Sequence, residues 1–303
     1  MQDQKQIIKG HGAAFLTILI WGTTFISTKI LLQDFTPVEI LFFRFLLGLA
    51  ALTAAYPHRL KITDKKQELI FIGAGLCGVC LYYLLENIAL TFTMASNVGV
   101  ILSVAPFFTA ILTWLFIRGE EKLRPSFFAG FVLAMAGIAI ISFNGKSLHL
   151  DPRGDLLAVA AALVWAFYSI LTKKISRFGY NTIQTTRRTF FYGILFMLPA
   201  VFFSDFSLQP GRFADPVNLF NFLFLGLGAS ALCFVTWNLA VKLLGVMKTT
   251  VYIYIGPVIT VITSVIVLHE KITGLMAVGI LLTLAGLVVS EGRVRLPWKK
   301  KEE

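Results

Sequence analysis

The side chains of this sequence that can do chemistry lie inside long apolar runs. Tyr82, Tyr83, Glu86 and Asn87 share one such run, where helical spacing places Tyr82 with Glu86 and Tyr83 with Asn87. The Glu86 carboxylate can bind an ammonium group while an apolar side chain stacks on tyrosine, and the same acid is the candidate carrier of a coupling proton. The alternative is an interfacial glutamate in water below an aromatic belt.

Aromatic rings form a second group of candidates. Trp21, Trp165 and Trp237 fall within apolar runs, Tyr168 lies three residues after Trp165, and Tyr252 lies in another run. Rings at such depth suit a largely apolar pocket with a few polar groups. Ordinary helix packing is the alternative for each ring, but as a group they favour an amphipathic or aromatic small molecule.

Two arginines and two asparagines occupy apolar runs at related positions. A charged group inside a bilayer is costly and usually faces a partner or a wet cavity. We therefore expect Arg44 and Arg188 either to tie helix ends and carbonyl groups together or to bind an anion. Asn87 and Asn238 are candidate binding residues, with hydrogen bonding between helices as the alternative.

The residues do not favour an enzyme. The four histidines are expected at helix ends or in loops, far apart in the sequence. Cys77 and Cys80 form a C-x-x-C without companion ligands, so a metal or redox site is not expected. There is no G-x-x-x-x-G-K-[ST] phosphate loop. We expect no catalytic residues, no metal and no cofactor, and keep an intramembrane enzyme as an alternative.

Composition shows which elements must position these side chains. The chain has 303 residues, of which 57% are hydrophobic and 14% are charged, whereas a soluble domain is about a quarter charged. A spanning helix takes about 20 apolar residues, so the sequence predicts an all-α membrane protein without a soluble domain. The expected helices are about 12–32, 37–56, 69–91, 95–117, 126–143, 155–175, 182–203, 217–241, 247–268 and 274–290.

The landmarks of the first half return in the second half in the same order. The interval from Asn87 to Pro106 is 19 residues, as is that from Asn238 to Pro257. The interval from Glu121 to Gly130 is 9 residues, as is that from Glu270 to Gly279. An offset of 144 relates Trp21 to Trp165 and Arg44 to Arg188. This register indicates an internal duplication.

The repeat predicts two five-helix units, residues 12–143 and 154–290, flanked by tails 1–11 and 291–303. Five is odd, so the second unit enters from the opposite face, as in the inverted repeats of many secondary transporters. Pro106 and Pro257 each remove a helix hydrogen bond at matching depths. Such kinks mark either a binding site or hinge or a static bend.

Positive charge predicts the orientation. If the amino terminus is cytoplasmic, nineteen Lys and Arg residues fall on the inner side and five on the outer side. Cytoplasmic loops carry the excess of Lys and Arg, so both termini are expected in the cytoplasm. The net charge of +11 is then explained by Lys and Arg in the cytoplasmic segments, and it does not indicate binding to nucleic acid.

Several local motifs resemble those of a known family. They are Trp21-Gly22, Arg44, the run from Ala95-Ser96 to Pro106, Glu120-Glu121-Lys122-Leu123, and Ala136-Gly137. Together they resemble the EamA family of the drug/metabolite transporter superfamily, over about residues 12–290. The resemblance implies ten helices in two inverted halves and, often, export of amino acids or other small metabolites. The first helix lacks the buried acid of the related small multidrug resistance proteins, so their proton-exchange scheme is not carried over.

These observations favour a secondary transporter of a small organic metabolite in the plasma (inner) membrane, working by alternating access and in the direction of export. The expected partners are a small-molecule solute and the lipid bilayer. The coupling ion stays open, with the proton as the candidate. A membrane receptor that does not transport is the second alternative, but it gives no reason for an inverted duplication.

Overall fold

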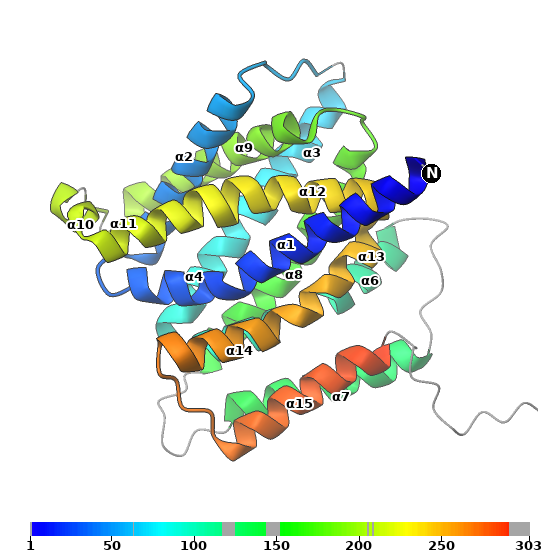
Figure 1. Cartoon of the computed structure of the whole chain (residues 1–303), viewed down its shortest axis with the longest axis vertical. Coiled ribbons are helices and arrows are strands. Elements are labelled where there is room, and N and C mark those ends of the chain that lie inside the picture. The colour runs from blue at the N-terminus through cyan, green and yellow to red at the C-terminus, as the bar shows by residue number, and fades with distance from the viewer. Residues whose placement is uncertain are drawn as a thin grey trace, which may run out of the picture.

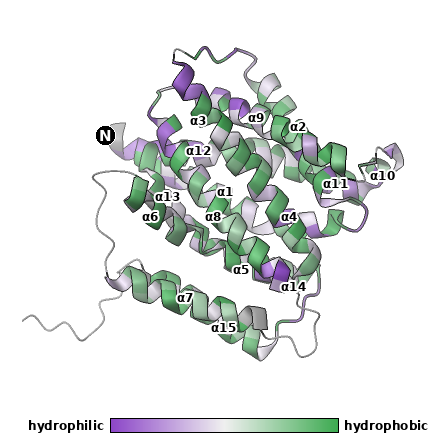
Figure 2. Ribbon diagram, turned by 180° about the vertical axis from the view of Figure 1, so that it is seen from behind, coloured by the Kyte–Doolittle hydropathy of each residue, from purple (hydrophilic) through white to green (hydrophobic). Residues whose placement is uncertain are grey.

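The regular structure of the chain is helical throughout the part described, in a computed structural model (Figure 1). The described residues are 2–62, 64–116, 125–143, 152–204, 206–207 and 209–290. Figure 2 shows hydrophobic residues along most helices and hydrophilic residues near helix ends, as at the start of α3. The protein is therefore all-α, as the sequence predicts.

The described residues of the first half form seven α-helices and one π-helical segment. The elements are α1 (Gln2–Leu31), α2 (Pro37–Ala55), α3 (Lys65–Gly75), η1 (Leu76–Leu81), α4 (Tyr82–Phe92), α5 (Ala95–Leu102), α6 (Ala105–Phe116) and α7 (Pro125–Phe143). Here α3, η1 and α4 form one continuous rod, and α5 and α6 are two parts of another, separated by a short turn. The tail predicted for residues 1–11 is helical from Gln2 onward, because these residues extend α1.

In the second half, the part that the structure describes forms eight α-helices, one π-helical segment and one 3-10 segment. The elements are α8 (Pro152–Ser176), α9 (Thr182–Phe203), α10 (Pro210–Ala214), α11 (Pro216–Leu223), η2 (Phe224–Leu232), α12 (Cys233–Leu244), α13 (Val246–Thr250), η3 (Val251–Ile255), α14 (Gly256–Val267) and α15 (Gly274–Ser290). Gly245 ends α12 with a φ of 83°, a conformation that glycine adopts without strain.

Seven helical stretches of the described residues are long and apolar enough to cross a membrane, and two shorter apolar helices span 125–140 and 274–289. The 22-residue α9 carries Arg187 and Arg188. The chain is thus a multi-pass membrane protein, while the number of ten spans stays a prediction.

Segments from the two halves pack against one another in pairs. Helix α1 packs on α12 while α4 packs on α8, and the pairs α2–α9, α5–α14 and α7–α15 also join the halves. Figure 1 shows α1, α12 and α14 side by side, with α7 and α15 forming a layer at one edge. A Cβ on Gly137 would lie 2.4 Å from Thr283 Oγ1, so small residues let α7 and α15 approach closely, as expected for packing glycines.

Hydrogen bonds at helix starts fix the entry of the chain into the bundle. Thr36 and Glu39 form a capping box at the start of α2: Thr36 N donates to Glu39 Oε2 at 2.8 Å, and Glu39 N donates to Thr36 Oγ1 at 3.3 Å. The Glu39 carboxylate also pairs with Arg212 at 2.9 Å, which ties α10 to this end of α2. Asn181 caps α9 by accepting from Ile183 N at 2.9 Å.

Candidate functional site

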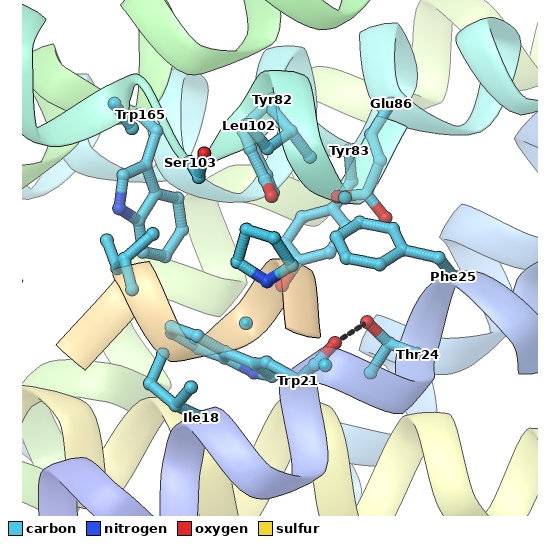
Figure 3. A pocket seen from close by; sticks show the side chains of 16 residues that line it. Ile18, Trp21, Thr24, Phe25, Tyr82, Tyr83, Glu86, Leu102, Ser103 and Trp165 are labelled. Carbon is cyan, nitrogen blue, oxygen red and sulfur yellow. Dashed lines mark hydrogen bonds between the residues drawn. The ribbon is translucent and has the colours of Figure 1, made fainter. Parts of the chain in front are cut away.

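A cavity of about 60 Å³ lies where the two halves meet. Its walls come from α1, α4, α5 and α6 of the first half and from α8, η3 and α14 of the second half. Figure 3 shows rings from three different helices facing it, with Trp21 on α1, Tyr82 and Tyr83 on α4, and Trp165 on α8. The cavity therefore belongs to both repeats rather than to either one alone.

The rings of this wall support one another through edge contacts. The ring centroids of Trp21 and Trp165 are 5.2 Å apart with an interplanar angle of 86°. Tyr82 lies 4.8 Å from Trp165 and 4.7 Å from Tyr83. Trp21 Nε1 donates to Ala229 O at 2.9 Å, which fixes the indole across the interface between the halves. Edge-to-face pairs of this kind hold rings in a defined geometry.

Glu86 supplies a carboxyl group to the aromatic wall. It lies one helical turn after Tyr82 and is only 1% exposed, so the alternative of a glutamate in interfacial water does not hold. Figure 3 shows its carboxyl group beside Tyr83 and Phe25 at the edge of the cavity. Oε1 has no hydrogen-bond partner within the described part of the chain. A buried polar atom without a partner requires an explanation, and a bound polar group is one.

Arg44 lies behind the same wall. Its Cζ is 4.4 Å from the centroid of the Tyr83 ring, and its Nε donates to Ser230 Oγ at 3.1 Å. The residue is fully buried, and neither terminal nitrogen has a partner among the described residues. It is close enough to Glu86 to interact with it electrostatically. Arg44 therefore adds a positive field to the cavity while contacting its lining through Tyr83.

Two rods with an irregular segment, α5–α6 and η3–α14, form one wall of the cavity. Pro106 lies in the first turn of α6 and Pro257 in the first turn of α14, each after an interruption of the rod. A short turn precedes α6 and the 3-10 segment η3 precedes α14, and Ser103 and Gly256 beside the prolines line the cavity. A Cβ on Gly99 would lie 2.6 Å from Thr260 Cγ2, so α5 and α14 touch at this level.

Several predicted residues surround the cavity without lining it. Trp237 is fully buried 5.2 Å from Trp21. Tyr168 lies 4.9 Å from Trp165, and its hydroxyl group donates to Asn238 Oδ1 at 3.2 Å. Asn238 Nδ2 in turn donates to Thr186 Oγ1 at 3.0 Å, so this set links α8, α9 and α12.

The remaining predicted residues lie farther from the cavity. Asn87 Nδ2 donates to Pro37 O at 3.1 Å. Its repeat mate Asn238 also makes a hydrogen bond between helices, to Thr186. Tyr252 OH lies 2.8 Å from His11 Nδ1, between η3 and α1. Arg188 forms an ion pair with Glu68 at 2.6 Å. These three bind other parts of the protein in this conformation.

A polar cluster at one end of the bundle was not foreseen in the sequence. We call Lys29, Thr93, Asp155 and Glu270, with the backbone of Ala95 and Ser96, the α5 latch. Glu270 accepts from Ala95 N at 2.9 Å and Ser96 N at 3.2 Å, which joins the loop after α14 to the start of α5. Lys29 Nζ donates to Leu90 O and Thr93 O, and Thr93 Oγ1 donates to Asp155 Oδ1 at 3.0 Å.

The latch joins both halves, because Asp155 and Glu270 come from the second half and the other groups come from the first. An acid at a helix amino terminus is favourable because it satisfies free N–H groups and complements the helix dipole. The repeat had marked Glu270 only as a landmark. Its partners lie about 175 residues away in sequence, so spacing alone could not reveal them.

Comparison with known proteins assigns the family. The profile of the EamA-like transporter family matches residues 8–143 and 152–291. The chain belongs to the EamA-like transporter family. Both matched segments follow the two halves, and the family confirms the resemblance carried by Trp21-Gly22, Arg44 and the other motifs.

EamA-like relatives from different organisms align with nearly the whole chain. An "Uncharacterized transporter" of Archaeoglobus fulgidus is 29% identical over 94% of this chain and 98% of its own length. A "Probable amino-acid metabolite efflux pump" of Escherichia coli is 24% identical, with 95% of each chain covered. A "Probable terminal-alkyne amino-acid exporter" of Streptantibioticus cattleyicolor is also 24% identical over 95% of each chain.

A solved structure shares the fold, with a TM-score of 0.66 at 22% identity over 93% of this chain and 96% of the other. The family and the named relatives therefore point to a multi-pass membrane transporter rather than an enzyme.

Proposed function

We propose that the protein is a secondary transporter that exports a small amphipathic or aromatic metabolite, such as an amino acid, across the plasma (inner) membrane by alternating access. The observation that carries this proposal is the cavity between the halves, where Trp21, Tyr82, Tyr83 and Trp165 surround the buried carboxyl group of Glu86. The ammonium group of the solute binds Glu86, and its apolar part packs on the rings.

The proposed architecture is ten spanning helices in two inverted halves, residues 12–143 and 154–290, with both termini in the cytoplasm. The packing supports it, because the main packing contacts between the halves have repeat-related counterparts. The first helix of one half packs on the third rod of the other in both directions, as α1 on α12 and α8 on α4. The second, fourth and fifth rods pack on their own repeat mates.

Related departures from helical regularity also support the repeat. Both third rods contain a π-helical segment, η1 in the first half and η2 in the second. Gly75 and Gly226 lie at the same offset as Asn87 and Asn238, and each glycine closely contacts the second rod of the other half. A π-helical segment inside a helix is frequent at functional sites.

The size of the cavity bears on the mechanism. Ligand pockets usually measure about 300–1,000 Å³, and this cavity measures about 60 Å³. The described cavity is thus smaller than a usual ligand pocket, and it must widen to admit a solute. The broken rods at Pro106 and Pro257 border the cavity and can act as hinges. The α5 latch lies at one end and must open when that end does.

The names of the relatives support an amino acid as the solute class, since two of them are named for amino-acid efflux or export. The proton is the proposed coupling ion, with Glu86 as its carrier. Asn87, Tyr168, Trp237 and Asn238 hold the surrounding helices. Arg44 contributes a positive electrostatic field to the site, and Tyr252 joins η3 to His11 of α1.

The proposal is tested by comparing metabolites exported by cells with and without the protein. Solutes that differ are then followed in liposomes that contain the purified protein, with and without an imposed proton gradient. We expect net movement of an amphipathic solute in protein-containing liposomes only. Equal fluxes with and without the protein, across a panel of amino acids and the solutes found in cells, would overturn the proposed transport activity.

A further inference from the structure

A second and larger cavity lies away from the site between the halves. Its volume is about 420 Å³, and it is formed by the end of α2, the loop after it and the start of α9. It shares no lining residue with the first cavity. The loop contributes Pro57, Arg59 and Leu60 to the lining of the cavity. Helix α9 contributes Gln184, Arg187, Arg188 and Phe191.

The polar side of this cavity is basic. Arg59, Arg187 and Arg188 line it, and no acidic residue does. Arg188 pairs with the carboxylate of Glu68, which does not line the cavity, and this leaves two guanidinium charges without a carboxylate partner among the described residues. Arg187 donates to Tyr56 O at 2.6 Å and to His58 O, and Gln184 Nε2 donates to His58 O at 3.1 Å. The loop is therefore held against α9.

The other side of the cavity is apolar and faces outward. Leu49, Leu60 and Phe191 line it, and Phe191 is 48% exposed. The exposed surface continues past it, because Leu46 on α2 is 43% exposed and Leu195 on α9 is 49% exposed. Both figures show α2 and α9 as neighbours (Figures 1 and 2), and the two helices pack on each other.

This arrangement has a position and a polarity that match one class of ligand. The cavity opens where α2 ends and α9 begins, which is the level at which chains leave the apolar core of a membrane. Basic pockets between spanning helices bind anionic lipid headgroups. Arginine is suited to phosphate because its planar fork donates to two oxygens at once. The apolar track from Phe191 to Leu195 is suited to an acyl chain.

We propose that this cavity is a binding site for an anionic phospholipid. Its phosphodiester group contacts Arg59 and Arg187, and one acyl chain lies against Phe191 and Leu195. The site holds the ends of α2 and α9 together. It does not depend on the proposed transport of a solute.

The test uses purified full-length protein and native mass spectrometry. Phosphatidylglycerol and phosphatidylcholine with the same acyl chains are titrated in turn, and glycerol 3-phosphate is added as a competitor. We expect phosphatidylglycerol to bind more tightly, with no displacement by glycerol 3-phosphate. Equal binding of the two lipids overturns the proposal, and efficient displacement assigns the site to a free phosphate compound instead.

Matched variants locate the binding. Arg59 is exposed, so Arg59→Gln is expected to fold and to lose about fivefold in affinity for phosphatidylglycerol, since one basic residue near an anionic lipid contributes about that much. Lys61→Gln removes a nearby exposed cation that does not line the cavity and is expected to bind as the unchanged protein does. Equal affinities of the two variants would place the lipid elsewhere.

Discussion

The α5 latch leads to a quantitative prediction about Glu270→Ala. The Glu270 carboxylate accepts hydrogen bonds from Ala95 N and Ser96 N at 2.9 and 3.2 Å. A hydrogen bond to a charged group contributes about 1.5–3 kcal/mol. Both bonds go to a single carboxylate, so we take this range for the pair. Opening of the latch in Glu270→Ala then becomes about 10- to 150-fold more favourable.

Amide hydrogen exchange measures this opening directly. In Glu270→Ala we expect the amides of Ala95 and Ser96 to exchange about 10- to 150-fold faster, because exchange requires the amide to leave its acceptor. Glu270→Gln retains one acceptor oxygen and should fall between the variant and the unchanged protein. Lys271→Ala is the control, because Lys271 is the exposed neighbour. Unchanged exchange at both amides in Glu270→Ala would refute the latch.

The same variant has a consequence for the transport cycle. The latch joins the halves in the described conformation, so its loss favours conformations in which that end is open. A variant that opens more easily at one end should change the balance of flux in the two directions through liposomes. Faster exchange without any change in flux would mean that the latch opens outside the transport cycle.

Four further predictions concern the cavity and the orientation. Trp165→Ala and Tyr82→Ala should each reduce flux about 10- to 150-fold, since burying a large apolar side chain contributes about 1.5–3 kcal/mol. Phe167→Ala on the outer face of α8 should not reduce flux, and equal flux in all three variants removes these rings from the site. Glu86→Gln should change the pH dependence of flux, because it removes the ionisable group of the cavity; an unchanged profile argues against proton carriage by Glu86. Gly99→Ala should reduce flux and lower stability by about 1–3 kcal/mol, because the added Cβ would lie 2.6 Å from Thr260 Cγ2, and full activity would show that α5 and α14 separate easily. A carboxy-terminal tag should react with an impermeant reagent only after cells are opened, and reaction in intact cells contradicts the predicted orientation.

Hydropathy located the helices well because each rod is a long apolar run with charged or turn residues at its ends. The segment predicted at 182–203 coincides with α9 (Thr182–Phe203), where Asn181 supplies a hydrogen-bonding cap. The start of α1 was placed too late, because the polar residues before Gly12 continue the helix beyond the apolar run. A hydropathy scale cannot detect such an extension, because the added residues are polar.

The π-helical segments could not be read from the sequence. They lie inside apolar runs whose composition does not change at their borders, so no periodicity distinguishes η1 or η2 from α-helix. The glycines at these places, such as Gly75 and Gly226, are the signal that was available. They mark the close approach of a neighbouring rod, but they do not reveal which rod approaches.

The cavity was predicted in part. Rings within apolar runs suggested Trp21, Tyr82 and Trp165 as pocket residues, and Glu86 was suggested because an acid inside a bilayer is costly. All four line the cavity. Thr24 and Phe25 were missed, although they follow Trp21 by three and four residues and share its face of α1. The proline pair Pro106 and Pro257 was informative because each proline lies in the first turn of a segment that lines the cavity.

The features of the site that the sequence did not predict depend on burial and on contacts between residues far apart in the chain. The sequence placed Arg44 in a membrane helix but could not show that it stacks on Tyr83 or bonds Ser230. It likewise related Arg188 to Arg44, yet Arg188 pairs with Glu68 and lies half-buried beside a different cavity. Residues at equivalent positions of the two repeats share a place in the fold, but they make different interactions because their neighbouring residues differ. The Glu121-Lys122 motif lies outside the described residues.

The central claim is that a solute occupies the cavity between the halves and that the cavity opens to each side in turn. Ser103 lines the cavity and is 1% exposed, so Ser103→Cys, in a chain whose three natural cysteines are replaced by alanine, reports on access. The most direct measurement is the labelling of this cysteine by an impermeant thiol reagent from each face of sealed vesicles, with and without the exported solute. The account predicts labelling from both faces, slowed by the solute. Labelling from neither face, or at rates that the solute does not alter, would contradict it.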